Sequence, residues 1–185
     1  MSKITQNLII ETFLRLLEKK DLQKITIKEL AALCEINRNT FYYHFKDLYD
    51  LLETVFRIQA QEVKEACIKH MPWQENMLRS MSFALEHKEA LYHLYESPRR
   101  DLLESYLYNV IGEVMERYIM EQAEGMEIEN KDLLLIVDFY KYALVGILLE
   151  WIRGGMQDDP RCILEKVGVL FDGSIGKALL RLKKN

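Results

Sequence analysis

Residues 26–46 have the sequence TIKELAALCEINRNTFYYHFK, which predicts two short helices joined by a turn. Thr26 is a good N-cap residue, and Glu29 follows it at the spacing of a capping box. The first helix carries an apolar stripe at i, i+3 and i+4, formed by Ile27, Leu30 and Ala31. Asn37 is a second N-cap, which opens a helix over 38–44. This arrangement is typical of a helix-turn-helix unit.

The second helix of this unit has a polar and aromatic surface. Phe41 and Phe45 lie four residues apart and can face a core. The side chains that then point elsewhere are Arg38, Asn39, Thr40, Tyr42 and Tyr43. Arg and Asn make bidentate pairs with guanine and adenine, and hydroxyl groups suit phosphate oxygens. The pattern favours a helix that lies in the DNA major groove. The alternative is a solvated helix held only by its two phenylalanines.

Two segments resemble a known family. Residues 36–46 (INRNTFYYHFK) and 26–31 (TIKELA) are similar to the signature of the TetR family of transcriptional regulators. Two positions depart from the family pattern, which usually has Gly at Glu35 and often has Lys at Leu48. A Glu at the first position is strained if its backbone has a positive φ. At the second position one phosphate contact is missing or is supplied by Lys46.

The DNA contacts follow from the helix-turn-helix and from a two-fold dimer, whose symmetry a double-stranded, pseudo-palindromic operator would mirror. We assign base reading to Lys28, Arg38, Asn39 and Tyr43. We assign phosphate contacts to Thr26, Asn37, Thr40, Tyr42, His44 and Lys46. The backbone amides at the two helix N-termini are expected to help bind the phosphates.

Composition predicts an all-α protein, because Gly and Pro number only eight and three and no run alternates with period two. The net charge of −4 is unevenly distributed. Residues 1–50 carry eight Lys or Arg against seven Asp or Glu, whereas residues 51–185 carry seventeen against twenty-two. This predicts a DNA-binding domain over 1–50 and a regulatory and dimerisation domain over 51–185.

Hydrophobic periodicity divides the chain into about nine helices. Outside the helix-turn-helix they are expected at 4–20, 47–70, 74–86, 88–95, 99–121, 132–153 and from 160 to 182. The helix 47–70 connects the DNA-binding head to the body and is the expected transmitter of a signal. The segment 132–153 is long and apolar, but three charged residues interrupt it, so no membrane association is expected.

The middle helices are rich in aromatic residues and methionine. Such residues at helical spacing are first of all core residues, and the alternative is a pocket for a small ligand. The resemblance implies that a pocket enclosed by these helices senses an effector, which is an unknown small molecule or protein. The candidate lining residues are Phe83, His87, Tyr92, Tyr106 and Tyr140. The body also resembles the short C-terminal domain common in Firmicutes-type members of the family.

The last two helices are expected to pair with a second copy of the chain. The helix 132–153 is apolar nearly all round, and one small body can hardly cover such a helix alone. The alternative is that the last helix packs only on its own chain. The resemblance agrees with pairing, since family members form a four-helix bundle from these helices. The predicted interface consists of Leu144, Ile147, Leu148, Trp151, Val167, Leu170, Phe171, Ser174, Ile175 and Ala178.

No pattern indicates an enzyme, a metal site or a cofactor. A phosphate loop, a nucleophile elbow and an H-E-x-x-H motif are all missing from the sequence. The three cysteines are far apart and suit a reducing cytoplasm. We therefore predict a DNA-binding regulator, a repressor by the commoner behaviour of the family. The alternatives are an activator controlled by a protein partner and a helical adaptor that binds no DNA.

Overall fold

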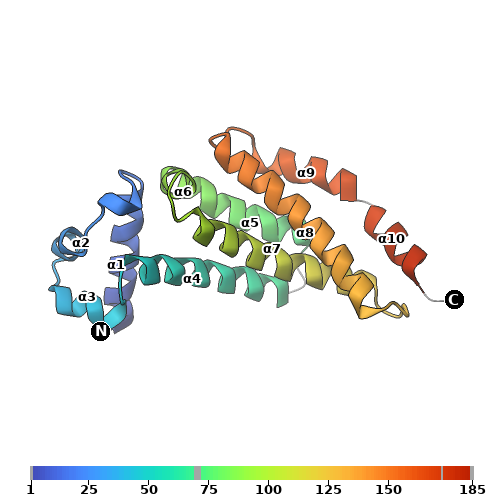
Figure 1. Cartoon of the computed structure of the whole chain (residues 1–185), viewed down its shortest axis with the longest axis horizontal. Helices are drawn as coiled ribbons and strands as arrows, with labels where there is room; N and C mark the ends of the chain where they lie inside the picture. Colours follow the sequence, from blue (N-terminus) through green and yellow to red (C-terminus); the bar gives the residue numbers. More distant parts are fainter. Residues whose placement is uncertain (1, 69–71, 172, 184–185) are drawn as a thin grey trace.

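Helices alone build the described part of the chain. The computed structural model describes residues 2–68, 72–171 and 173–183, and these form ten α-helices and one short 3₁₀-helix, with no strand among them. The predicted all-α class is therefore confirmed. Figure 1 shows the N-terminal head at one end of the long axis and the C-terminal helix at the other.

The head is a small helical unit with a helix-turn-helix. It consists of α1 (Ser2–Leu17), the 3₁₀-helix η1 (Leu22–Lys24), α2 (Ile27–Leu33) and α3 (Arg38–His44). Both predicted N-caps are confirmed. The Thr26 Oγ1 atom accepts a hydrogen bond from the Glu29 amide at 3.2 Å, and the Asn37 Oδ1 atom accepts one from the Thr40 amide at 2.8 Å. Each cap satisfies an amide that the first turn of a helix leaves without a partner.

A shared apolar core holds these helices together. Phe41 and Phe45 are buried, as predicted, with their ring centroids 5.8 Å apart. They belong to the same core cluster as Phe13 of α1 and Leu30 of α2. Burying each such side chain contributes about 1.5–3 kcal/mol. The core therefore fixes the position of α3 relative to α1 and α2.

The body begins with α4, which leaves the head and runs along the other long helices (Figure 1). Its helices are α4 (Leu48–Ile68), α5 (Trp73–Glu86), α6 (Lys88–Tyr95), α7 (Arg100–Gln122), α8 (Asn130–Arg153), α9 (Pro160–Phe171) and α10 (Ser174–Leu182). α4 packs against α5 and α7, α7 against α8, and α9 against α5. Within the described residues, no helix has the length and apolar character that a membrane crossing requires.

Some predicted helix boundaries need correction. The helix α6 has the predicted bounds, but α1 ends at Leu17 rather than Lys20, and the Lys19 amide donates to the Leu16 carbonyl three residues back, as in a tightened final turn. The predicted last helix is two helices, with Gly173 between them at φ +68°, outside the helical region. The predicted end of the 47–70 helix lies beyond Ile68, outside the described residues. The boundary between residues 50 and 51 stays a prediction, and α4 runs across it without a break.

Candidate nucleic-acid interface and body pockets

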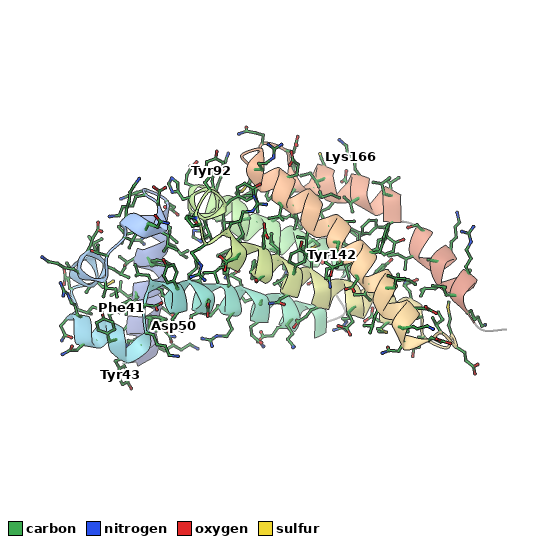
Figure 2. All side chains as sticks on the ribbon, viewed as in Figure 1. Phe41, Tyr43, Asp50, Tyr92, Tyr142 and Lys166 are labelled. Carbon is green, nitrogen blue, oxygen red and sulfur yellow. The ribbon has the colours of Figure 1, made fainter. Side chains whose placement is uncertain are left out.

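α3 presents a polar and aromatic face to solvent. Arg38, Asn39 and Tyr42 are exposed, and Tyr43 keeps 78% of its surface accessible. Figure 2 shows Tyr43 pointing out of the head while Phe41 points into it. Guanidinium, amide and phenol groups that project together from one helix can pair with base edges and phosphate oxygens, so this face suits contact with a polar partner surface.

The cations of this surface are available to bind phosphate. Lys28, Arg38 and Lys46 are exposed, and in the part of the chain that the structure describes none of them forms an ion pair. In contrast, the Nζ atom of Lys24 lies 2.5 Å from the Asp21 carboxylate. The positive charge for a DNA backbone is therefore concentrated around α2 and α3, although the whole chain is acidic.

Hydroxyl groups and caps occupy the two helix N-termini. Thr26 accepts a hydrogen bond through Oγ1, so its hydroxyl hydrogen can still be donated to a phosphate. The Thr40 hydroxyl donates to the Asn37 Oδ1 atom at 3.1 Å and would have to rotate to reach DNA. Thr40 and His44 are half-buried, whereas Thr26 and Asn37 are exposed. The predicted phosphate contacts therefore differ in how freely they can be made.

The turn between α2 and α3 uses a left-handed residue. Glu35 has φ +54°, so the strain expected at this position is present. The Glu35 amide donates to the Ala32 carbonyl at 3.1 Å, and the Ile36 amide to the Ala31 carbonyl at 3.0 Å. These two bonds form a Schellman motif, which ends α2 and sets the direction of the chain into α3.

The middle of the body encloses a narrow apolar void. Its volume is about 30 Å³, and its lining includes Phe83 and Tyr106, two of the predicted pocket residues, together with Phe56 and Trp151. The Tyr106 ring stacks on Phe56 at 4.6 Å between centroids. Burial, and to a lesser degree the charge of Glu62, raises the pKa of Tyr106, so its hydroxyl stays neutral at physiological pH. The void has room for water but not for a drug-sized molecule.

The other three predicted pocket residues lie outside this void. His87 lines a smaller void with Phe83 and α1 side chains. Tyr92 is exposed, because the apolar residues of α6 occupy the opposite side of that helix. Tyr140 packs on Phe171 at 4.6 Å, and its hydroxyl lies 2.8 Å from Ser174 Oγ. The structure thus does not bring the five residues into one pocket.

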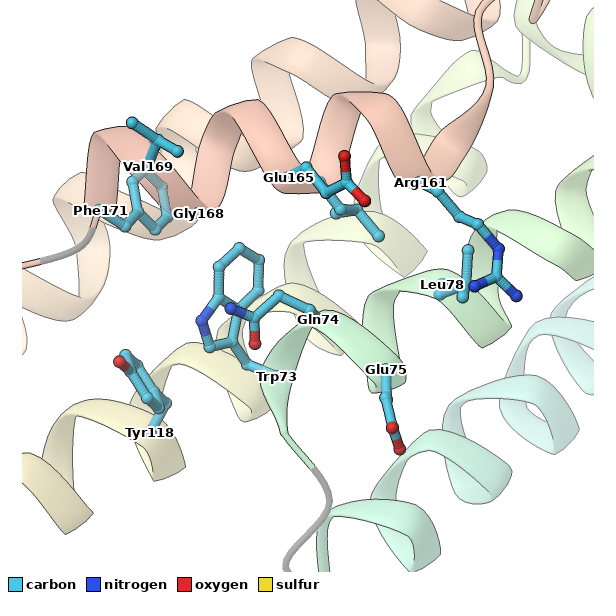
Figure 3. Close-up of a pocket in the computed structure, with 11 residues that line it drawn as sticks. Trp73, Gln74, Glu75, Leu78, Tyr118, Arg161, Glu165, Gly168, Val169 and Phe171 are labelled. Carbon is cyan, nitrogen blue, oxygen red and sulfur yellow. The ribbon is translucent and has the colours of Figure 1, made fainter.

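An open cleft of about 630 Å³ lies between α5 and α9 (Figure 3). Its apolar wall includes Trp73, which stacks on Phe171 with the ring centroids 5.6 Å apart. Arg161 and Glu165 reach its rim from α9. Sequence reasoning missed this cleft, since periodicity does not reveal which helices pair. Among the described residues, no group of three His, Cys, Asp or Glu side chains is placed to hold a metal ion.

The residues predicted at the dimer interface divide into two groups. Six are buried within their own chain, and they are Leu144, Leu148, Trp151, Val167, Phe171 and Ile175. The other four keep accessible surface, and they are Ile147, Leu170, Ser174 and Ala178. The buried six pack within the chain's own core and offer little surface to a second subunit.

The accessible apolar side of α8 is formed by other residues. Leu135, Phe139 and Tyr142 are exposed and lie at i, i+4 and i+7, on one side of the helix. Next to them, an open groove of about 660 Å³ runs along α8 and includes Gly146 and Ile147. Helical spacing could have identified this stripe. However, the helix is apolar on nearly every side, so its sequence contains several such stripes and does not show which one is exposed.

Two family models match this chain. Residues 9–55 match the bacterial regulatory proteins of the tetR family, and residues 72–173 match a transcriptional regulator C-terminal region of that family. The first match covers the helix-turn-helix and the start of α4, and the second covers most of the body.

The chain is also similar to individual transcriptional regulators in sequence and in fold. The chain is 25% identical to the uncharacterized HTH-type transcriptional regulator YerO of Bacillus subtilis (strain 168), in an alignment that covers 92% of this chain. It is also 25% identical to the HTH-type transcriptional regulator AcrR of Shigella flexneri, over 65% of this chain. It spans 66% and 55% of those two relatives, less than two thirds of each. The solved structure of the dihydroxyacetone kinase operon activator DhaS has the same fold, with a TM-score of 0.71 and 18% identity over 98% of this chain and 99% of that one. The chain belongs to the tetR family of bacterial regulatory proteins.

Proposed function

We propose that the chain is a homodimeric repressor that binds a pseudo-palindromic operator and releases it when an effector binds the body. The observation that carries the proposal is the exposed face of α3, where Arg38, Asn39 and Tyr43 face solvent and Phe41 anchors the helix in the core. A two-fold dimer presents one such helix per subunit, and the operator would share this symmetry.

Within each half-site, we assign side chains to bases or to phosphates from their chemistry and their exposure. Arg38 and Asn39 lie in the first turn of α3, which enters the groove in this class of protein, and both can form bidentate pairs with bases. We assign a base contact also to Tyr43 and to Lys28. Lys46, just beyond α3, is exposed and suits a phosphate.

The exposed apolar side of the body supports a dimer. Leu135 and Phe139 of α8 and Leu170 of α9 are all large, apolar and accessible. Large contiguous apolar patches on a single chain mark interaction sites. We place the subunit interface on this side of α8 together with Ile147, Leu170, Ser174 and Ala178, rather than on the residues buried within the chain. Interfaces of permanent dimers are commonly this apolar.

The effector is proposed to act through the central void. The void is too small for a ligand as it stands, so binding requires its helices to separate. Phe56 of α4 lines the void, and α4 continues without interruption to the head. A ligand that binds better to the separated arrangement would shift α4 and change the distance between the two recognition helices.

Selection of binding sites from random DNA with the purified chain tests the proposal. We expect enriched sequences with two inverted half-sites and protection of both halves by one dimer. Enrichment of no sequence over the starting pool, or of a single half-site, would contradict it.

Activation is the second candidate. The HTH-type dhaKLM operon transcriptional activator DhaS of Lactococcus lactis (subsp. lactis, strain IL1403) is 25% identical over 87 residues, which are 47% of this chain and 46% of that protein. A reporter gene placed behind the selected operator distinguishes the two. Repression predicts higher expression when the gene for this chain is deleted, and activation predicts lower expression.

A further inference from the structure

The body holds the head through side chains as well as through α4. The Nδ1 atom of His93, on α6, lies 2.6 Å from the carbonyl oxygen of Leu17, the last residue of α1. α1 and α6 pack directly against each other. A side chain of the body thus caps the C-terminus of a head helix.

The chemistry of this contact defines the donor. A carbonyl oxygen only accepts hydrogen bonds, so the Nδ1 atom of His93 must carry the proton. Leu17 is buried at 1% exposure, and a buried carbonyl that loses its partner costs more than the bond contributes when present. The last carbonyls of a helix also need partners from outside the helix. Removing the His93 donor therefore disfavours the observed seating of α1 on α6.

Two further contacts lie close to the joint, which is the region where α1 packs against α6. The Nδ1 atom of His87 lies 3.4 Å from a carboxylate oxygen of Glu18, and the Arg99 guanidinium lies 4.6 Å from the centre of the Tyr49 ring at the start of α4. The first contact joins the residue after α1 to the residue before α6, and the second joins the start of α4, where the chain leaves the head, to the residue before α7. They are longer than the His93 bond and are partly exposed, so each contributes less.

The joint controls α3 through the head's core. α1 packs against α2 and α2 packs against α3, so a change in the position of α1 is passed on to α3. We propose that His93 is a positioning residue for operator recognition: by capping α1 it fixes the angle of the head on the body and thereby the separation of the two recognition helices in the dimer. This inference rests on the proposal that a dimer binds the DNA. His93 itself is not expected to contact a base or a phosphate.

The consequence differs for one and for two half-sites. A dimer that binds two half-sites at once must hold both heads at the correct separation, and loosely held heads lose orientational freedom on binding. A dimer that binds one half-site has no such requirement. Loss of the cap should therefore weaken binding to the full operator and leave binding to a single half-site unchanged.

The test uses the best sequence selected by the wild-type chain, a DNA with one of its half-sites scrambled, and a DNA with one base pair inserted between the half-sites. His93→Phe keeps a ring without the donor, and His93→Asn is the matched control because its amide can donate from a similar position. We expect His93→Phe to lose about tenfold on the full operator, one hydrogen bond being removed in each of two subunits. It should change less than twofold on the single half-site and be less sensitive than wild type to the insertion. His93→Asn should restore most of the loss.

Other results would overturn the inference. An equal loss by His93→Phe on the full and single-site DNAs would mean a damaged head, and no loss on the full operator would mean that the cap does not position it. If wild type itself binds both DNAs equally, the dimeric reading fails, and this inference fails with it. Should His93→Phe not fold, Glu18→Ala loosens the same joint from the partly exposed side. It should show a smaller loss confined to the full operator, and a loss on both DNAs or on neither would refute the role of the joint.

Discussion

Replacing Glu35 with glycine should stabilise the head, although it removes a side chain. Glu35 ends α2 at φ +54°, a conformation that costs a residue with a Cβ atom about 1–2 kcal/mol. Its side chain is exposed and, among the described residues, forms no ion pair, so little is lost with it. Glycine adopts this conformation without strain but loses about 0.5–1 kcal/mol more backbone entropy on folding. The net expectation for Glu35→Gly is a gain of roughly 0–1.5 kcal/mol, with a central value of about 0.8 kcal/mol.

Glu35→Ala is the matched control, because it removes the same carboxylate and keeps the Cβ atom. The two hydrogen bonds of the Schellman motif use only backbone atoms, so both variants retain them. We expect alanine to give no such gain. A change in DNA affinity that both variants share would reflect the loss of a negative charge close to the DNA-binding face.

Equilibrium unfolding in urea, followed by circular dichroism, measures the change in free energy. Hydrogen exchange of the α2 and α3 amides shows whether the gain is located in the head. If Glu35→Gly is no more stable than Glu35→Ala, the left-handed backbone carries no strain that glycine relieves, and this reasoning is wrong.

Three further predictions concern function. Arg38→Ala should cost roughly 1–3 kcal/mol per half-site and relax preference at one base pair, whereas Lys46→Ala should weaken binding to all DNA alike and lower the salt dependence by about one unit. Titrations of operator and scrambled DNA over a salt series measure both, and an equal loss by Arg38→Ala on the two DNAs would contradict its base-reading role. Leu170→Asp should give folded monomers in sedimentation, since Leu170 is 71% exposed and contributes little to its own core; wild-type monomers at micromolar concentration would rule out the dimer. An effector that weakens operator binding must itself bind more weakly, by the same factor, to the operator complex. Calorimetry with and without operator measures this factor, and an unchanged effector affinity would exclude the coupling.

The amino-acid sequence by itself predicted where most of the helices lie, although not the break between α9 and α10. Thr26 and Asn37 cap α2 and α3 as expected, and α6 has the expected bounds. These features depend on hydrogen bonds and side-chain spacing within a few residues, which the sequence displays directly. The outward face of α3 was predictable for the same reason, because burial of Phe41 and Phe45 determines where the intervening side chains point. The family signature lies within this same local region.

The tertiary structure alone decided which helix faces meet. Leu170 and Phe171 are neighbours of similar hydrophobicity, yet one is 71% exposed and the other 9%. Phe171 is buried because Trp73 of α5 and Tyr140 of α8 lie against it. Likewise, only the seating of α1 on α6 places His93 at the end of α1. Such contacts join residues far apart in the chain, and hydrophobicity drives burial without specifying the partner.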